Sequence, residues 1–278
     1  MMATKPTLAA AAVLMLLGNP AAACVDLQGE LQQGGLVWGQ LAAGSSVTLD
    51  GESLDVLADG TFIAGFGRNA AAASVLQVEG AGACRQTLAI ASRDYNIQRV
   101  EGVPQQTVTP PPEQLARIAR ERALVNAAKN RRVERPDLLA QALAGFRWPV
   151  KGRISGVYGS QRVYNGTPGN PHYGLDVAVP TGTIVRAPAS GIVTLAEPDL
   201  FYSGGTIILD HGYSLSSSFL HLSKVRVAVG DEVEAGAVIG EVGATGRATG
   251  PHLDWRMSWR NARIDPQFLV PELPMSQP

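Results

Sequence analysis

The chain has 278 residues, and its 23 basic and 24 acidic side chains give a net charge of −1. This near balance excludes the strongly basic surface that is typical of nucleic-acid-binding proteins. The length suffices for two modest domains, and 31 glycines with 18 prolines favour a turn-rich β protein.

The first 23 residues have the three parts of a secretory signal peptide. Lys5 supplies a positive charge, an apolar run extends from Leu8 to Leu17, and Ala21-Ala22-Ala23 has the small residues of a cleavage site. The run is too short to span a bilayer as a stable helix, and no second run approaches that length. We therefore expect an exported, periplasmic protein that loses residues 1–23 and has no stable membrane span.

The sequence contains two cysteines, Cys24 and Cys84. In an oxidising compartment the two can form a disulfide, which would tie the start of the mature chain to a strand of the first domain. An alternative is that Cys24, directly after the alanines, carries a lipid that anchors the protein. We prefer the disulfide, because Ala21 stands where lipid-attachment signals usually have a larger aliphatic residue and Cys84 would otherwise lack a partner.

Residues 24–104 show the pattern of short strands separated by turns. Apolar segments predict strands at residues 46–49, 61–63, 74–78 and 86–90. Asp50-Gly51 and Asp59-Gly60, beside these segments, are typical of hairpin turns. Because the segment contains no histidine, we expect a small β-sandwich-like N-terminal domain that serves binding or packing and not chemistry.

Residues 105–146 are predicted to form a proline-rich and helical linker. Thr109-Pro110-Pro111-Pro112 stiffens the chain, and from Glu113 apolar residues recur at the spacing of an amphipathic helix. The helix is rich in arginine, which we interpret as a solvated face. Pro136 at a first-turn position predicts a second short helix.

Residues 147–272 are again predicted to be rich in β-strands, at 189–194, 206–209 and 237–242. The fold class is therefore mainly β, with an antiparallel β-sheet in the C-terminal domain. Histidine is the commonest metal ligand and the usual general base near neutral pH. All four histidines of the chain lie in this segment: His172, His211, His221 and His252.

Two of these histidines lie close to an aspartate in the sequence. His172 and Asp176 would be roughly 13 Å apart on an extended strand, but Gly174 permits a bend that brings them together. His252 and Asp254 are two residues apart, so both point to one face of a strand. The pattern predicts a metal site.

Six motifs follow one another between residues 147 and 270. They are Gly156-Val-Tyr-Gly159, His172-x-x-x-Asp176, Pro188-Ala-Ser-Gly191, Asp210-His211-Gly212, Phe219-Leu-His221-Leu and Gly250-Pro-His252-Leu-Asp254-Trp. Their order and spacing resemble the lysostaphin/LytM-type zinc endopeptidases. The resemblance implies a β-sheet with a groove, a single zinc ion (Zn2+) and hydrolysis of peptide bonds in peptidoglycan.

The resemblance also implies roles for individual residues. His172 and Asp176 fall on the first two zinc ligands of the family. His221 and His252 fall on the pair of catalytic histidines that assist the attacking water and the tetrahedral intermediate. His211 lies on a His-Gly turn, and we interpret it as structural.

The chain departs from the family at the third zinc ligand, where the second histidine of His-x-His is replaced by Asp254. Carboxylate oxygen can ligate zinc at about 2.0–2.2 Å, so we expect His172, Asp176 and Asp254 to hold the ion. A second anionic ligand should weaken the acidification of water by the metal, and Asp254→His should keep or raise activity. If Asp254 instead forms a salt bridge with an arginine such as Arg256, His252 becomes the expected ligand and Asp254 an orienting base.

Three functions compete. The first is an exported zinc endopeptidase that cleaves peptidoglycan peptide stems at direct D-amino-acid cross-links. The second is a catalytically inactive LytM-like regulator that binds cell wall or activates a hydrolase partner such as an amidase. The third begins from residues 227–242, which resemble the hairpin repeat of biotinyl or lipoyl carrier domains. Those domains need a lysine at a hairpin tip, but Lys224, the only lysine after Lys151, precedes the repeat, so we set the third aside.

Overall fold

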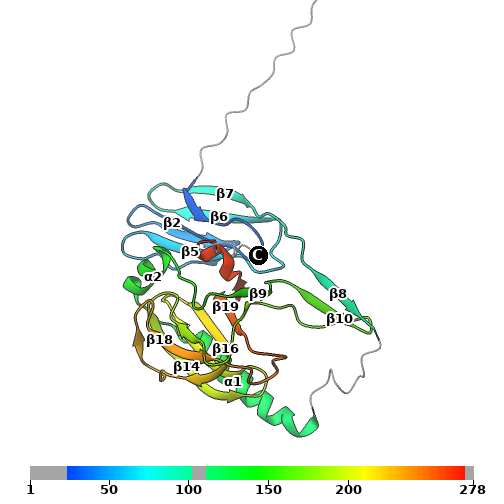
Figure 1. Cartoon of the computed structure of the whole chain (residues 1–278). Helices are drawn as coiled ribbons and strands as arrows, with labels where there is room; N and C mark the ends of the chain where they lie inside the picture. The colour runs from blue at the N-terminus through cyan, green and yellow to red at the C-terminus, as the bar shows by residue number, and fades with distance from the viewer. Residues whose placement is uncertain (1–23, 102–110, 273–278) are drawn as a thin grey trace, which may run out of the picture.

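A computed structural model describes residues 24–101 and 111–272 of the chain. The expected signal peptide, residues 1–23, lies outside the described residues. Most of the regular structure is β-strand in antiparallel sheets, which confirms the predicted fold class. Figure 1 shows the N-terminal strands (blue and cyan) stacked on the C-terminal sheet (green to red), with two helices beside it.

The N-terminal strands form two small antiparallel sheets. One has the order β1-β2-β5, with β1 Leu27–Gly29, β2 Leu36–Gln40 and β5 Thr61–Gly65. The other has the order β4-β3-β6-β7, with β3 Ser46–Leu49, β4 Glu52–Ser53, β6 Ala73–Glu79 and β7 Cys84–Ala89. Asp50 and Gly51 have φ of 52° and 86° at the β3–β4 hairpin, which is the backbone that two-residue hairpins prefer and Asp-Gly accommodates.

Side chains of the N-terminal sheets are buried in a core that they share with the C-terminal sheet. In β6 every second side chain from Ser74 to Val78 is buried, as strand alternation requires. The hydrophobic core then extends from Ile63 of β5 to Trp259 and Ile264. The two parts of the chain are therefore held together by apolar packing.

Cys24 and Cys84 form the predicted disulfide, with their Cα atoms 5.7 Å apart. The bridge ties the start of the described chain to the first residue of β7. Gln86 adds a second tie, because the Cys24 amide donates a hydrogen bond to its Oε1 at 3.0 Å.

We expect the double variant Cys24→Ser/Cys84→Ser to lower the free energy of unfolding by about 4 kcal/mol. The bridge joins residues 60 apart in sequence, and the loop-entropy model assigns about 4 kcal/mol to a loop of that length. Urea denaturation of the variant and the wild type, each with and without reductant, measures the difference. Equal stability of the variant and the oxidised wild type would contradict the expectation.

The helical elements are η2 Pro112–Gln114, α1 Leu115–Asn130 and α2 Pro136–Leu143. The two predicted helices are thus confirmed, with Pro136 in the first turn of α2. Arg120 and Arg122 of α1 are exposed, as predicted, whereas Arg117 pairs with Asp199 at 3.0 Å. None of the helices in the described ranges combines the length and apolar character needed to cross a membrane.

The C-terminal sheet has antiparallel pairings throughout, and its main strand order is β17-β14-β15-β16-β19-β12-β9. Strands β13, β18 and β20 pair along its margins. The bounds are β9 Arg153–Gly156, β12 Leu175–Ala178, β13 Ile184–Arg186, β14 Gly191–Leu200, β15 Gly204–Asp210, β16 Leu215–Val225, β17 Glu232–Val233, β18 Val238–Val242, β19 Leu253–Trp259 and β20 Ala262–Ile264. A short helix, η3 Pro266–Leu269, follows.

A separate three-stranded sheet joins the two halves of the sequence. Strand β8, Ile97–Val100, pairs in parallel with β10, Gln161–Tyr164, and β10 pairs with β11, Thr167–Pro168. The last strand before the linker is therefore hydrogen-bonded to the segment that leads to His172. Figure 1 shows β8 and β10 as a long arm beside the main body.

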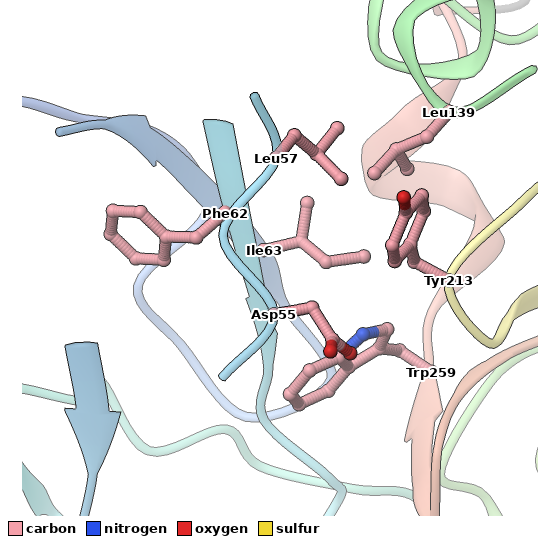
Figure 2. Close-up of a pocket in the computed structure, with 7 residues that line it drawn as sticks. All are labelled: Asp55, Leu57, Phe62, Ile63, Leu139, Tyr213 and Trp259. Carbon is pink, nitrogen blue, oxygen red and sulfur yellow. The ribbon is translucent and has the colours of Figure 1, made fainter. Parts of the chain in front are cut away.

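A small, mainly apolar pocket lies where β5, α2 and the C-terminal sheet meet. Figure 2 shows Leu57, Ile63, Leu139 and Tyr213 pointing toward one another at this junction. Its complete lining is Asp55, Leu57, Phe62, Ile63, Leu139, Tyr213 and Trp259. Asp55 also pairs with Arg132 at 2.6 Å and with Arg260 at 3.2 Å, so this pocket belongs to the packing between segments and not to the histidine site.

Candidate metal centre

The C-terminal sheet brings two of the predicted metal ligands directly opposite each other. Asp176 of β12 is the cross-strand partner of Asp254 of β19. His172 lies in the loop before β12, four residues before Asp176. Like charges directly opposite on adjacent strands are destabilising, so this arrangement calls for a positive charge between the carboxylates.

The donor atoms of these residues converge. His172 Nε2 is 3.1 Å from Asp176 Oδ1 and 3.5 Å from Asp254 Oδ2. Two ligands at about 2.0–2.1 Å from a tetrahedral zinc ion are separated by roughly 3.3 Å. Within residues 24–101 and 111–272, this is the one group of three or more His, Cys, Asp or Glu donor atoms within 4.8 Å of one another.

Two of the donor atoms also lack a hydrogen-bond partner in the described part of the chain, as expected of buried atoms that bind a metal. His172 Nε2 and Asp176 Oδ1 are buried and have no hydrogen-bond partner among the described residues, although they are only 3.1 Å apart. Burial opposes a charge on His172, but the Asp176 and Asp254 carboxylates outweigh it and raise the pKa of His172 to about 10. The group therefore attracts a cation, and the residues present fit a zinc ion.

Each histidine of the site is oriented by a backbone carbonyl. His172 Nδ1 lies 3.2 Å from Val157 O, and His252 Nδ1 lies 2.8 Å from Gly250 O. A proton on Nδ1 donated to the carbonyl leaves Nε2 as the atom that can bind a metal, which in His172 would replace the proton that the two carboxylates favour. This is the usual way that proteins fix the tautomer of a ligating histidine. In both residues it is Nε2 that faces Asp176.

Asp254 has a second partner besides His172. Arg256 donates from Nε to both Asp254 oxygens at 3.0 Å and from its Nη2 to Oδ2. Asp254 is buried, but the Arg256 guanidinium and the His172 ring hold its pKa well below the usual range. The salt bridge that, on the sequence, makes His252 the expected ligand in place of Asp254 is therefore present. Asp254 nevertheless faces His172, and the group of converging donors contains no His252 atom.

Two glycines make room for the carboxylates. A Cβ at Gly156 would lie 2.1 Å from Asp176 Oδ2, and a Cβ at Gly174 would lie 2.3 Å from Asp254 Oδ1. No side chain can be accommodated at such distances without moving the carboxylate. Gly174, which the sequence predicts to bend the chain, also lets the loop before β12 lie close to β19, because glycine has no Cβ.

Gly156→Ala should weaken zinc binding about 10–100-fold, the range for lost support around a metal ligand. The added methyl group must displace the Asp176 carboxylate, because β9 and β12 are paired at this position. Gly67→Ala is the matched control, since a Cβ there meets nothing closer than 4.0 Å. Competition titration with a chelating indicator measures both affinities, and equal affinity of the two variants would contradict the expectation.

The two predicted catalytic histidines lie next to each other and beside the converging donors. The ring centroids of His221 and His252 are 4.8 Å apart, and His252 Nε2 is 3.8 Å from Asp176 Oδ1. His221 Nδ1 lies 2.8 Å from Thr245 O, and burial lowers the pKa of His221. In both rings a backbone carbonyl holds Nδ1, so Nε2 is the nitrogen left for the site.

The backbone at His221 explains how this side chain reaches the site. His221 has φ of +64°, an uncommon conformation for a residue other than glycine. It lies where β16 changes partner, since Leu220 pairs with Asp254 and Leu222 pairs with Val242. The irregularity redirects the ring, and simple strand alternation could not have predicted it.

His211 is structural, as the sequence predicted. Its Nδ1 is 2.8 Å from Ser190 O, and its Nε2 is 2.8 Å from Ser217 Oγ. Complete burial lowers the pKa of His211 to about 4. Both ring nitrogens are thus occupied in the core.

Comparison with known proteins agrees with these observations. Residues 170–266 match the family described as Peptidase family M23. Peptidoglycan DD-endopeptidase ShyA of Vibrio cholerae is 36% identical over 130 residues, which cover 46% of this chain and 30% of that protein. DD-carboxypeptidase/endopeptidase Mpg of Neisseria meningitidis is 41% identical over 100 residues, which cover 36% of this chain and 22% of that protein. The chain thus spans less than a third of the length of these curated relatives.

A crystal structure from Pseudomonas aeruginosa, of a candidate M23 peptidase, resembles nearly the whole chain. The sequences are 32% identical, the TM-score is 0.65, and the alignment covers 87% of this chain and 95% of the other. The likeness therefore includes N-terminal strands as well as the metal centre. On these grounds the chain belongs to peptidase family M23.

Proposed function

We propose that this protein is an exported zinc metalloendopeptidase that hydrolyses peptide cross-links of peptidoglycan. The observation that carries the proposal is the convergence of His172 Nε2, Asp176 Oδ1 and Asp254 Oδ2, two of which have no hydrogen-bond partner among the described residues. His172, Asp176 and Asp254 would hold the ion. A bound zinc ion supplies a Lewis acid that polarises a carbonyl and acidifies water.

Arg256 offsets the charge that Asp254 adds to the site. Two carboxylates would neutralise a zinc ion, and the Arg256 guanidinium, which is paired with Asp254, returns one positive charge to the cluster. A zinc ion with two neutral histidines and one aspartate has the same net charge. The expected loss of acidity is therefore reduced, since the pKa of water at a metal follows the total local charge.

A carboxylate can serve Arg256 and a metal at once. Each carboxylate oxygen has two lone pairs, and Asp254 Oδ2 accepts from both Nε and Nη2 of Arg256. Ligation through Oδ2, which lies 3.5 Å from His172 Nε2, therefore requires Arg256 Nε to donate to Oδ1 alone, and Nε already lies 3.0 Å from that oxygen. Ligating carboxylates are commonly hydrogen-bonded in this way, and the partner fixes their orientation. We therefore keep Asp254 as the third ligand.

His252 and His221 are proposed to move protons. His252 Nε2 would take a proton from the attacking water, because Gly250 O holds its Nδ1 at 2.8 Å and leaves Nε2 basic. His221 would stabilise charge that develops on the scissile carbonyl oxygen once its Nε2 has taken up a proton, because Nδ1 is committed to Thr245 O. The 4.8 Å between the ring centroids lets both act on one tetrahedral carbon.

The substrate class comes from relatives. ShyA is named a peptidoglycan DD-endopeptidase and Mpg a DD-carboxypeptidase/endopeptidase. We propose the direct D-amino-acid cross-link between peptide stems as the substrate, and the periplasm as the location after removal of residues 1–23. Residues 147–272 would form the peptidase domain, with residues 24–104 as a β domain and residues 105–146 as a linker.

Digestion of purified peptidoglycan tests the function. The zinc-loaded protein should release uncross-linked stem peptides, and a chelator should abolish the release until zinc is restored. Chromatography with mass spectrometry identifies the new amine and carboxylate ends and so the bond that is cut. Unchanged cross-linking at full zinc occupancy would rule out the enzyme.

A second candidate function is a non-catalytic regulator that binds cell wall or a hydrolase partner such as an amidase. The observation that favours it is the Asp254–Arg256 pair, because two carboxylates with Arg256 and a protonated His172 form a balanced cluster that needs no metal. The two functions differ in zinc content. Under the regulator hypothesis the protein should bind no stoichiometric zinc and should stimulate an added amidase with or without chelator.

A further inference from the structure

The sheet face that carries Asp254 continues past the metal centre. Cross-strand partners share a face, and Leu195, Ile208, Ser218 and Arg256 form one row across β14, β15, β16 and β19. Side chains alternate along β19, so Asp254 lies on the same face as Arg256. Whatever packs on this row lies next to the metal centre.

Helix α1 packs on this row. Ala128 is buried against Leu195 and Ile208, and Figure 1 shows α1 beside β14 and β16. The next residue, Lys129, is half-buried and interacts electrostatically with Arg256. The linker thus contributes a cation to the surroundings of the metal centre.

Strand β20 supplies another cation. Arg263 is directly opposite Ser258 of β19, which places it on the face that carries Arg256. Arg263 is half-buried and interacts electrostatically with both Arg256 and Lys129. Three cations therefore gather at one end of the site.

Lys129 and Arg263 form no salt bridge with any described residue. In the part of the chain that the structure describes, Arg256 is paired with Asp254, but no acidic side chain lies within salt-bridge distance of Lys129 or Arg263. Burial, together with the Arg263 and Arg256 charges, outweighs the attraction of Asp254 and lowers the pKa of Lys129 to about 7. Half-buried cations of this kind gain stability from an anion that binds between them.

We propose that Lys129 and Arg263 form a carboxylate subsite that recognises peptides with a free carboxylate on the residue at the amine side of the scissile bond. The proposal rests on the proposed peptidase function and names part of its specificity. Arg263 is opposite Ser258, which lies four residues and roughly 13 Å from Asp254 along β19. The long Arg263 side chain interacts with Arg256, which is halfway between the two, so it lies toward a group one residue away from an amide held at Asp254. A guanidinium matches a carboxylate with two parallel hydrogen bonds.

The subsite should discriminate between an acid and an amide. A carboxamide in place of the carboxylate leaves both cations unpaired, and a site built for an ionised group rejects the neutral analogue strongly. We expect N-acetyl-D-alanyl-D-alanine to bind about 10–100-fold more tightly than its carboxamide, which is the range for loss of a charge-assisted hydrogen bond.

Titration calorimetry on the full chain tests this expectation. His252→Ala, loaded with zinc, serves as the background so that the peptide is not cleaved, and a chelator-treated sample shows the contribution of the metal. Arg263→Gln should remove the preference for the acid, and Lys129→Gln should reduce it. Arg120→Gln is the matched control, because Arg120 is exposed on the same helix as Lys129 and should leave the preference unchanged.

The outcomes separate the subsite from the proposed function. Equal binding of acid and carboxamide, or equal weakening of both by Arg263→Gln, would overturn the subsite. Competition by inorganic phosphate at the concentration that the acid requires would show a general anion site and would also overturn the carboxylate assignment. If Arg263→Gln removes the preference for the acid and the wild-type protein cleaves no peptide, the subsite is supported and the peptidase function fails.

Discussion

His252→Ala should lower the turnover of a cross-linked stem peptide by about 10²–10⁴-fold, the usual contribution of a general base. His252 Nε2 lies 3.8 Å from Asp176 Oδ1, next to the converging donors but outside the group that they form. The variant should therefore bind as much zinc as the wild type. Steady-state kinetics together with metal analysis of the same sample measures both effects.

The zinc content of this variant separates the two roles considered for His252. Full zinc occupancy with lost turnover assigns His252 to the base. If His252→Ala instead loses zinc, His252 is a metal ligand and Asp254 is its orienting base.

Asp254→His should bind zinc at least tenfold more weakly than the double variant Asp254→His/Arg256→Gln. The sequence alone predicts that the single exchange keeps or raises activity, because it restores the family's ligand. The structure revises this expectation, since Arg256 is paired with Asp254 and would face a neutral imidazole in the single variant. An unpaired, largely buried charge costs more than an unsatisfied neutral group, which costs about 1–3 kcal/mol.

A double-mutant cycle measures the coupling. Zinc affinity is determined for the wild type, Asp254→His, Arg256→Gln and the double variant, with circular dichroism to verify that each is folded. Each single variant should be weaker than the double variant, because each leaves one member of the pair without its partner. Additive effects of the two exchanges would show that Arg256 does not act through Asp254.

The sequence predicts the elements of this fold well because their signals are local. Asp50-Gly51 adopts the hairpin turn that its residue types favour, and Pro136 begins α2. The disulfide was also expected, since two cysteines allow one pairing. The candidate metal ligands followed from the family resemblance of the six motifs, and the structure brings their donor atoms within 4.8 Å.

The features that the sequence does not predict depend on contacts between distant segments. The direction of His221 follows from a strand irregularity with φ of +64°, which no local residue preference requires. The position of Lys129 above the sheet depends on the packing of Ala128 against Leu195 and Ile208. Helical periodicity predicts the helix but gives its buried side only in part, since Ile118 is buried whereas Leu115 and Ala119 are exposed.

Arg256 shows a different limit. The sequence identifies it as a candidate partner of Asp254, but treats the salt bridge and metal ligation as exclusive. The geometry places Asp254 Oδ2 within reach of both Arg256 and His172. Arg256 Nε is 3.0 Å from both Asp254 oxygens, so it can donate to Oδ1 and leave one lone pair of Oδ2 for a metal. Only coordinates reveal that both partners are near.

Anomalous diffraction at the zinc edge, from crystals of the zinc-loaded full chain, tests the central claim most directly. We expect one zinc ion bonded to His172 Nε2 and to one oxygen each of Asp176 and Asp254, at about 2.0–2.2 Å, with Arg256 still paired to Asp254. A zinc ion bonded to His252 in place of Asp254, or the absence of an anomalous peak at this site, would contradict the three-ligand centre.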